Sequence, residues 1–344
     1  MASEVVSASD AIQTLMYGTR YIGLSALIVS MSLCHAQGFN IAHHNQNMLG
    51  ASGRSIFEQA DGYLMFSVQW SLNTTHSELF ITKFNEVGEF ISEQSYPTDR
   101  NTDPGIMDPV ARRATGGYAV TVSLFGGNDP NVTRLLLFDP NGELVFDHFV
   151  KTDTIGFGNH GTRQLIELSD GHFLHSGWCS VPVNTPCITK IDSTGEIIWE
   201  HGYEIPYASY IFSATPTTDG GFVLGSKINS YPDQGVIIKV DSLGEQIWLR
   251  RFGGMSITGG SRVEELTDGS FLSIGAWESL NSPPLSEMQY GSLYRFTSSG
   301  SQIWRKDYFY GWKAGMAHIR RASEDLYWLV GAGYNEDYTQ VHHI

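Results

Sequence analysis

Residues 219–254 of this 344-residue chain read DGGFVLGSKINSYPDQGVIIKVDSLGEQIWLRRFGG. An apolar run starts at Phe222, directly after an Asp-Gly-Gly turn. A second run leads into the turn Asp241-Ser-Leu-Gly244, which lies four residues before Trp248. Glycine and aspartate tolerate the backbone conformations that tight hairpins require. The segment therefore predicts short antiparallel strands that are joined by tight turns.

This unit recurs along the chain about every 50 residues. Fragments such as IDSTGEIIWE (191–200) and FTSSGSQIWR (296–305) repeat the second turn and the tryptophan, and FDPNGELVFD (138–147) and FNEVGEFISE (84–93) are weaker copies. The glycines of this turn are Gly88, Gly142, Gly195, Gly244 and Gly300, at intervals of 54, 53, 49 and 56 residues. The pairs that mark the earlier turn are Asp61-Gly62, Gly116-Gly117, Asp170-Gly171, Gly220-Gly221 and Asp268-Gly269. A sixth copy, SEDLYWLVGAGY (323–334), has lost these glycines.

Each unit resolves into four strands, which in the third copy are residues 162–169, 172–179, 187–193 and 196–203. Four antiparallel strands per unit, repeated radially, form the blade of a β-propeller. One blade cannot bury both of its faces, so stacking must supply the core, and the outer aromatic residue fills the gap between blades. The sequence therefore predicts an all-β fold, a single β-propeller of about six four-stranded blades that occupies residues 37–344. Almost no helix is expected there, since apolar residues show no sustained period of 3.6.

A repeated cation precedes the second turn, at Lys83, Lys190, Lys239 and Arg295. We interpret these side chains as solvated or turn-paired charges and not as parts of a site.

The ring needs a closing strand, because the sixth unit ends at VHHI in what resembles its third strand. Residues 39–45 precede the first unit and have no place in it, so we expect them to supply the missing outer strand. A closed ring would leave no long unpaired edge. The alternative is that the chain is a fragment whose remaining blades are absent.

An export signal is predicted at residues 1–36. The uncharged run YIGLSALIVSMSL (21–33) follows Arg20 and precedes Cys34-His-Ala36, which places cleavage after Ala36. The acidic residues upstream of Arg20 are atypical, so Met16 is the preferred initiator. Lipid attachment at Cys34 and a buried strand or helix are the alternatives. The run is too short to span a bilayer, so the mature chain is expected to have no transmembrane segment and to be periplasmic or extracellular.

Cleavage leaves two cysteines, Cys179 and Cys187, which flank a predicted hairpin loop. Export leads to oxidising conditions, so a disulfide is expected if the two strands pair with these positions nearly opposite. Two free buried thiols are the alternative.

Composition and motifs narrow the possible partners. The net charge of −15 disfavours nucleic acid and anionic membranes, which are also negative.

The sequence has no nucleophile elbow, zinc-protease, phosphate-loop or EF-hand motif, so no catalytic residue, cofactor or metal site is predicted. His172 and His175 are separated by an odd number of strand positions and should point to opposite faces. The alternative is a metal site formed by His43, His44, His342 and His343, which closure of the ring would bring together. We also expect the protein to be a monomer.

The pattern DGGF…KVDSLGEQIW…RFGG resembles a class of exported bacterial β-propeller repeats related to the PQQ-like repeats, over about residues 50–344. The residues that carry it best are Asp219, Gly220, Gly221, Phe222, Lys239, Asp241, Gly244 and Trp248. The resemblance implies a surface or extracellular binding or scaffold module. Quinoprotein dehydrogenases share the Asp–Gly–Trp order, but their adjacent cysteines and calcium ligands are not recognisable here. Sialidases place the aspartate of their Asp-box two residues before glycine, whereas Asp241 lies three residues before Gly244.

Arginines concentrate on the predicted first strand of the blades, which lines the central channel. They are Arg54, Arg112, Arg113, Arg163, Arg262, Arg320 and Arg321. Such a lining suits a carboxylate or a phosphate, and the candidate ligand-binding residues are Arg54, Arg113, Arg163, Arg262 and Arg321. The alternative is a structural role in which these arginines pair with Glu58, Glu167, Glu264 or Glu265.

Two functional hypotheses follow. The first is a non-catalytic binding or scaffold module for a protein, a glycan or a small anionic ligand, which would engage the loops and the channel mouth. The second is a glycan-processing or quinoprotein-like enzyme, which needs two carboxylates or a cofactor cage that converge in the channel.

Overall fold

The computed structural model describes thirteen stretches of the chain. These are residues 48–71, 77–96, 101–103, 109–125, 132–150, 162–179, 185–228, 234–253, 262–278, 289–308, 313–323, 326–334 and 341–343. The predicted signal (1–36), its cleavage site and the predicted closing strand (39–45) lie outside these stretches. The described residues form strands and turns only, which confirms the all-β prediction.

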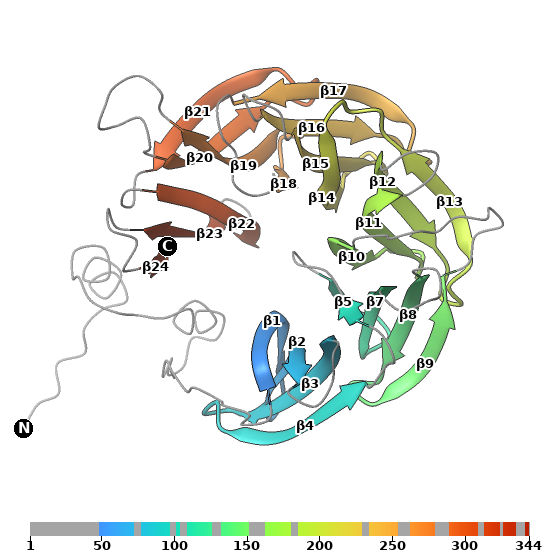
Figure 1. Ribbon diagram of the computed structural model, residues 1–344. Coiled ribbons are helices and arrows are strands. Elements are labelled where there is room, and N and C mark those ends of the chain that lie inside the picture. Colours follow the sequence, from blue (N-terminus) through green and yellow to red (C-terminus); the bar gives the residue numbers. More distant parts are fainter. Residues whose placement is uncertain are drawn as a thin grey trace, which may run out of the picture.

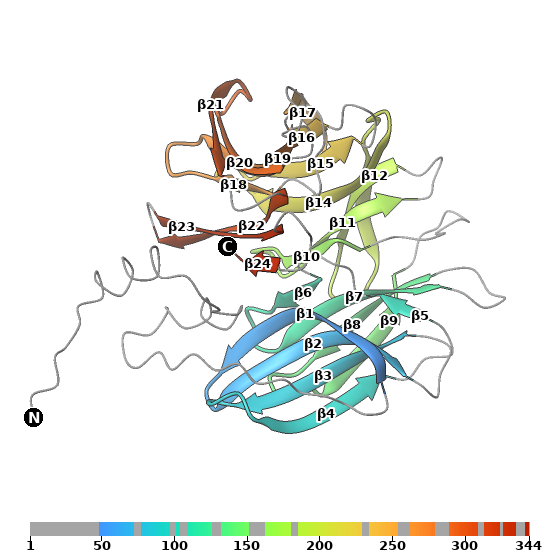
Figure 2. The same ribbon diagram turned by 60° about the vertical axis from the view of Figure 1, so that its left-hand side comes forward.

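Six small antiparallel sheets follow one another around a ring, so the protein is a six-bladed β-propeller (Figures 1 and 2). Blade 1 contains β1 (Met48–Gln59), β2 (Gly62–Ser71), β3 (Ser77–Asn85) and β4 (Phe90–Tyr96). Blade 2 contains β5 (Asn101–Asp103), β6 (Val110–Arg112), β7 (Tyr118–Phe125), β8 (Val132–Phe138) and β9 (Leu144–Phe149). Blade 3 contains β10 (Gln164–Glu167), β11 (Phe173–Cys179), β12 (Thr185–Ile191) and β13 (Ile197–Gly202).

The second half of the ring repeats this plan. Blade 4 contains β14 (Ala208–Pro216), β15 (Phe222–Ile228), β16 (Gln234–Val240) and β17 (Gln246–Phe252). Blade 5 contains β18 (Val263–Glu265), β19 (Phe271–Glu278), β20 (Gln289–Phe296) and β21 (Gln302–Tyr308). Blade 6 contains β22 (Lys313–Ser323), β23 (Leu326–Tyr334) and β24 (Val341–His343). A single parallel pair, Gln289 with Lys313, connects blades 5 and 6.

Two blades differ from the predicted four strands. In blade 2 the inner strand is divided, because β5 and β6 pair with different ends of β7. In blade 6 the described residues provide three strands, of which β24 is the outermost. The sequence also predicts only three strands from this end of the chain. Residues 39–45, which are expected to supply the fourth strand, lie outside the described stretches.

Strand order within each blade runs from the centre outward. In Figure 1, β1, β10, β14, β18 and β22 lie nearest the centre, and β4, β9, β13, β17 and β21 form the rim. Each blade hairpin is antiparallel, so the inner strands all begin at one face of the ring and end in a short turn at the other. This geometry places residues before β10 and before β14 at the same face.

The glycine turns have the geometry that the sequence predicts. Gly244 has a φ of 87°, and its N–H donates to the carbonyl of Asp241 at 3.1 Å. The Asp241 carboxylate also accepts hydrogen bonds from the N–H groups of Leu243 and Glu245, each at 2.9 Å. A left-handed conformation favours glycine, and the aspartate satisfies amides that no strand would pair.

Five hydrophobic clusters form the core, and each draws on two consecutive blades. Between blades 4 and 5, for example, Val223 and Phe252 pack with Phe271 and Tyr294. Trp248 of β17 also contacts the ring of Phe271, with centroids 5.9 Å apart, and its indole N–H donates to the carbonyl of Ser298 at 3.2 Å. These contacts confirm that each blade obtains its core from its neighbour and that the outer aromatic residue bridges the gap.

Three of the four repeated cations, Lys190, Lys239 and Arg295, are turn-paired, as one of the two interpretations proposed. Their partners are the aspartates of the first turn in the same blade. The ammonium of Lys190 lies 2.6 Å from Asp170, that of Lys239 lies 2.9 Å from Asp219, and the guanidinium of Arg295 lies 2.6 Å from Asp268. Partial burial favours a higher pKa for Asp219, but hydrogen bonds from Thr217 and Lys239 outweigh it and lower this pKa from 3.8 to about 2.

Candidate functional site

The backbone positions of the seven arginines agree with the sequence prediction. Each lies on the inner strand of its blade or directly beside one end of it. The inner strands that Figure 1 labels, such as β1, β10 and β22, lie near the centre of the ring. Arg54 lies on β1, Arg112 on β6, and Arg320 and Arg321 on β22, whereas Arg113, Arg163 and Arg262 adjoin β6, β10 and β18. The contacts of their side chains then separate them into different roles.

Several of these arginines have surroundings that fit a structural role. The Nε of Arg113 lies 4.0 Å from a carboxylate oxygen of Glu167, which is one of the pairs weighed from the sequence. The side chain of Arg262 is buried, and that of Arg54 is half-buried on β1. Arg321 is exposed, and its Nε donates to the carbonyl of Ser323 at 3.3 Å. The five candidate residues therefore do not share one environment.

Two inner-strand carboxylates hold neighbouring blades together. Glu265 of blade 5 accepts a hydrogen bond of 2.7 Å from the N–H of Thr218 in blade 4, and another of 3.1 Å from the Thr218 hydroxyl. Glu167 of blade 3 accepts the equivalent N–H of Ala114 in blade 2. Both carboxylates bond to turns of the preceding blades, so their function is structural. They therefore do not support the enzymatic hypothesis, which needs two carboxylates that converge in the channel.

Arg163 has different surroundings. Its guanidinium carbon lies 3.8 Å from the ring centroid of Tyr210 and 5.7 Å from that of Phe212, both on β14. Trp178, at the end of β11, meets Tyr210 edge-on with centroids 6.4 Å apart. We call these four residues the Arg163 cluster. A guanidinium stacked on an aromatic ring is held in place while the N–H groups on its edge remain directed outward.

Within the described stretches, Arg163 forms no ion pair, and its Nε has no hydrogen-bond partner. Some other cations there are neutralised locally. Arg134, for instance, pairs with Asp147, and Arg305 lies 2.9 Å from Asp307, whereas Arg250 and Lys306 lie over Trp248 and Trp304. In a chain with 36 acidic and 21 basic residues, a cation that lies on aromatic rings without a carboxylate is a candidate for binding an external anion.

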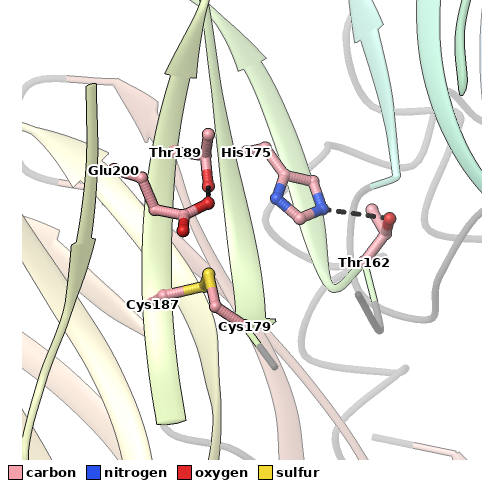
Figure 3. The surroundings of a disulfide bond; sticks show 6 residues. All are labelled: Thr162, His175, Cys179, Cys187, Thr189 and Glu200. Carbon is pink, nitrogen blue, oxygen red and sulfur yellow. Dashed lines mark hydrogen bonds between the residues drawn. A yellow bond between two sulfur atoms is a disulfide. The ribbon is translucent and has the colours of Figure 1, made fainter. Parts of the chain in front are cut away.

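Backbone and side-chain bonds fix the Arg163 cluster. The N–H of Arg163 donates to the carbonyl of Ser176 at 2.9 Å, and Thr162 beside it bonds to the buried His175 at 3.0 Å (Figure 3). The side chain of Gln164 accepts the N–H of Ala214 at 2.6 Å, which ties β10 to β14. The arginine and its aromatic neighbours therefore lie on strands that are bonded to each other across the blade junction.

The disulfide between Cys179 and Cys187 is present, which confirms the prediction (Figure 3). The Cα atoms are 5.7 Å apart, and the register is diagonal, because Cys187 pairs with Gly177 while Cys179 pairs with Thr185. The bridge joins β11 and β12 at the end next to Trp178. It therefore fixes the hairpin that carries one member of the Arg163 cluster.

Removal of this bridge is expected to lower the free energy of unfolding by about 2.5 kcal/mol, because it closes a short loop of separation 8. The paired Cys179→Ala and Cys187→Ala variant should show this loss in urea unfolding monitored by tryptophan fluorescence. Reductant should destabilise the wild type and leave the double variant unchanged. An effect of reductant on the variant would contradict the assignment of the stabilisation to this bond.

His175 makes the free energy of unfolding depend on pH. Burial lowers the pKa of its imidazole from 6.5 to about 4. The folded state then binds fewer protons than the unfolded state between these values, so the free energy of unfolding falls as the pH drops from 6.5 to 4. The maximum contribution is about 3 kcal/mol. Glu200 acts in the opposite direction, because burial raises its pKa.

His175→Gln is therefore expected to reduce the loss of stability between pH 6.5 and pH 4, measured by urea unfolding at several pH values. His172→Gln is the matched control, since that imidazole is at the surface and lies 3.1 Å from Asp170. Equal pH slopes in His175→Gln and the wild type would show that His175 is not the responsible group.

Histidine contacts do not indicate a metal centre. His172 bonds to Asp170 and His175 to Thr162, so the two imidazoles have separate partners. No group of three or more His, Cys, Asp or Glu side chains in the described stretches could hold a metal ion. Residues 43–44 lie outside those stretches, so the weaker alternative of a site with residues 342–343 is not tested.

Sequence reasoning found Arg163 but missed Trp178, Tyr210 and Phe212. A usable signal was present, because Tyr210 and Phe212 alternate with the buried Ile211 on one strand. Alternation places both aromatic residues on the face opposite Ile211. The described residues also contain no helix long and apolar enough to cross a membrane.

Comparison with known proteins supports the fold alone. No protein-family model and no curated protein matches the sequence, so the resemblance to PQQ-like repeats is not confirmed. Among solved structures, the chain is similar to the Hadza microbial sialidase Hz136, with 8% identity, a TM-score of 0.51, and coverage of 83% of this chain and 63% of that one. A protein of unknown function from Bacteroides caccae (16% identity, TM-score 0.39, coverage 62% and 70%) is also similar. So is an endo-arabinase from Bacteroides thetaiotaomicron (9% identity, TM-score 0.39, coverage 85% and 91%).

Proposed function

We propose that this protein is an exported, non-catalytic β-propeller that binds an anionic ligand at the junction of blades 3 and 4. The Arg163 cluster is the binding site, and the guanidinium of Arg163 is its anchoring charge. The observation that carries this proposal is the position of Arg163, which stacks on Tyr210 at 3.8 Å without a carboxylate partner among the described residues.

Three further observations support it. Arg163 directly precedes the inner strand β10, and its side chain is only half-buried. The disulfide is consistent with an oxidising compartment, which supports export. The bonds of Glu167 and Glu265 to neighbouring turns explain the inner-strand carboxylates without catalysis.

The test is a thermal-shift and calorimetric panel of small anions, comprising glucuronate, citrate and inorganic phosphate, on residues 37–344. At least one anion is expected to bind, and Arg163→Gln should weaken it about tenfold or more, since hydrogen bonds to charged groups contribute about 1.5–3 kcal/mol. Arg134→Gln is the control, because Arg134 already pairs with Asp147. Equal affinity in the wild type and Arg163→Gln would refute the site.

A further inference from the structure

Tyr207 adopts a conformation that tyrosine rarely adopts. Its φ is 62°, and it is the one non-glycine residue with positive φ in the described stretches. It follows Pro206 in a tight turn in which the N–H of Ala208 donates to the carbonyl of Ile205 at 3.0 Å. A turn with proline second and positive φ third normally has glycine or asparagine at the third position. A side chain with a Cβ is therefore strained here.

The strain of Tyr207 has no compensation from packing. Its side chain is 75% exposed, so it contributes little to the core. Strained backbone that the fold does not need is a reason to look for a function. The turn leads directly into β14, which carries Tyr210 and Phe212, and β14 begins at the same face as β10. Tyr207 therefore lies three residues before Tyr210, at the face of the ring where Arg163 precedes β10.

The combination of charge and rings restricts the ligand. A guanidinium edge matches a carboxylate with two parallel hydrogen bonds. Flat aromatic rings add contacts to the apolar C–H face of a sugar ring, and an exposed ring beyond the anchoring charge suits a second sugar. A free phosphate would use the charge of Arg163 and would gain nothing from Tyr207.

We infer that the ligand is an acidic oligosaccharide, with the carboxylate of one uronic acid on Arg163 and a neighbouring sugar on Tyr207. This inference rests on the proposed anion site and adds the class of ligand and a specificity-determining residue. Tyr207 is the residue that distinguishes a sugar chain from a small anion.

The experiment is isothermal titration calorimetry with trigalacturonic acid, its fully methyl-esterified form and inorganic phosphate. The acid should bind, and the ester should bind at least tenfold more weakly because it has lost its charges. Tyr207→Asn should lower the affinity for trigalacturonic acid about fivefold or more. It should leave the thermal stability of the protein unchanged or raise it, since asparagine suits the turn. Ile247→Asn, on the rim strand β17 and 56% exposed in the wild type, is the control and should leave affinity unchanged.

The outcomes separate the two proposals. Binding of phosphate or small carboxylates that depends on Arg163 but is indifferent to Tyr207 would overturn the oligosaccharide inference and leave the anion site intact. Equal binding of the acid and its ester would also overturn it, because the carboxylate would then be irrelevant. A lower thermal stability of Tyr207→Asn would show that the tyrosine has a structural role and would contradict the inference. Failure of every anion to bind would refute both proposals.

Discussion

Gly221→Ala is expected to lower the free energy of unfolding by at least about 4 kcal/mol, whereas Gly220→Ala should cost only about 1 kcal/mol. A Cβ on Gly221 would overlap the carbonyl oxygen of Val240 and lie 2.7 Å from the ammonium of Lys239. That ammonium cannot move away easily, because it bonds to Thr217, Asp219 and the Val240 carbonyl. The backbone at Gly221 must therefore move away from the carbonyl of Val240 in the adjacent strand.

Gly220 is the matched control one residue earlier in the same turn. Its φ of 85° strains any residue with a Cβ, but no heavy atom lies within 4 Å of the position that the Cβ would occupy. Urea unfolding followed by tryptophan fluorescence measures both variants. Equal costs for the two substitutions would show that the predicted overlap with the Val240 carbonyl does not make Gly221 the more demanding position.

The second large effect concerns closure of the ring. At the junctions of blades 2 and 3, 3 and 4, and 4 and 5, the second-turn glycine of one blade packs on the outer strand of the blade before it. Gly244 packs on Trp199 and His201, and Gly300 packs on Trp248 and Arg250. At the junction of blades 5 and 6, the equivalent Trp304 instead borders a pocket of about 340 Å³. Its other lining residues are Leu266, Thr267, Asp268, Leu272, Arg295 and Tyr327.

Sequence spacing is compatible with Gly38 as the glycine that belongs there. The distance from the turn glycine to the inner-strand residue that begins the next hairpin is 21 positions from Gly195 to Pro216, from Gly244 to Glu265 and from Gly300 to Arg321. It is 24 positions from Gly88 to Arg112 and 25 positions from Gly142 to Glu167. From Gly38 to Glu58, the corresponding residue of blade 1, it is 20 positions. We propose that residues 39–45 supply the outer strand of blade 6.

Deletion of residues 37–46 is then expected to lower the free energy of unfolding by about 4 kcal/mol. Covering parts of Trp304 and Tyr327 removes on the order of 150 Å² of apolar surface from water, at about 25 cal/mol per Å². The measurement is urea unfolding of residues 37–344 and 47–344, with tryptophan emission shifting to the red as Trp304 is exposed. Equal stability of the two chains would favour the alternative that the missing blade strand comes from elsewhere.

Local patterns explain why the blades could be predicted from the sequence. Turn glycines, the alternation of apolar residues and the outer aromatic residue depend on neighbours that are near in the chain, so their spacing defines each hairpin. The disulfide could be predicted for the same reason, because eight positions separate its cysteines. The partners of Lys190, Lys239 and Arg295 also lie within one blade, although the sequence left open whether these cations are solvated or turn-paired.

The Arg163 cluster could be predicted only in part, because it forms between blades. Arg163 and Tyr210 are 47 positions apart, and their contact depends on the angle between two sheets. The sequence also could not separate Arg113, which pairs with Glu167, from Arg163, since both lie directly beside an inner strand. Side-chain partners across a junction decide these roles, and no local pattern records them.

Each of the five core clusters belongs jointly to two adjacent blades, and this arrangement has a consequence for proteolysis. A blade cut away from its neighbours would expose half of two clusters and could not persist as a fragment. Digestion should therefore proceed from the intact ring directly to short peptides, with no resistant product the size of one blade. A ligand bound across blades 3 and 4 would protect the entire chain and not only the segments it touches.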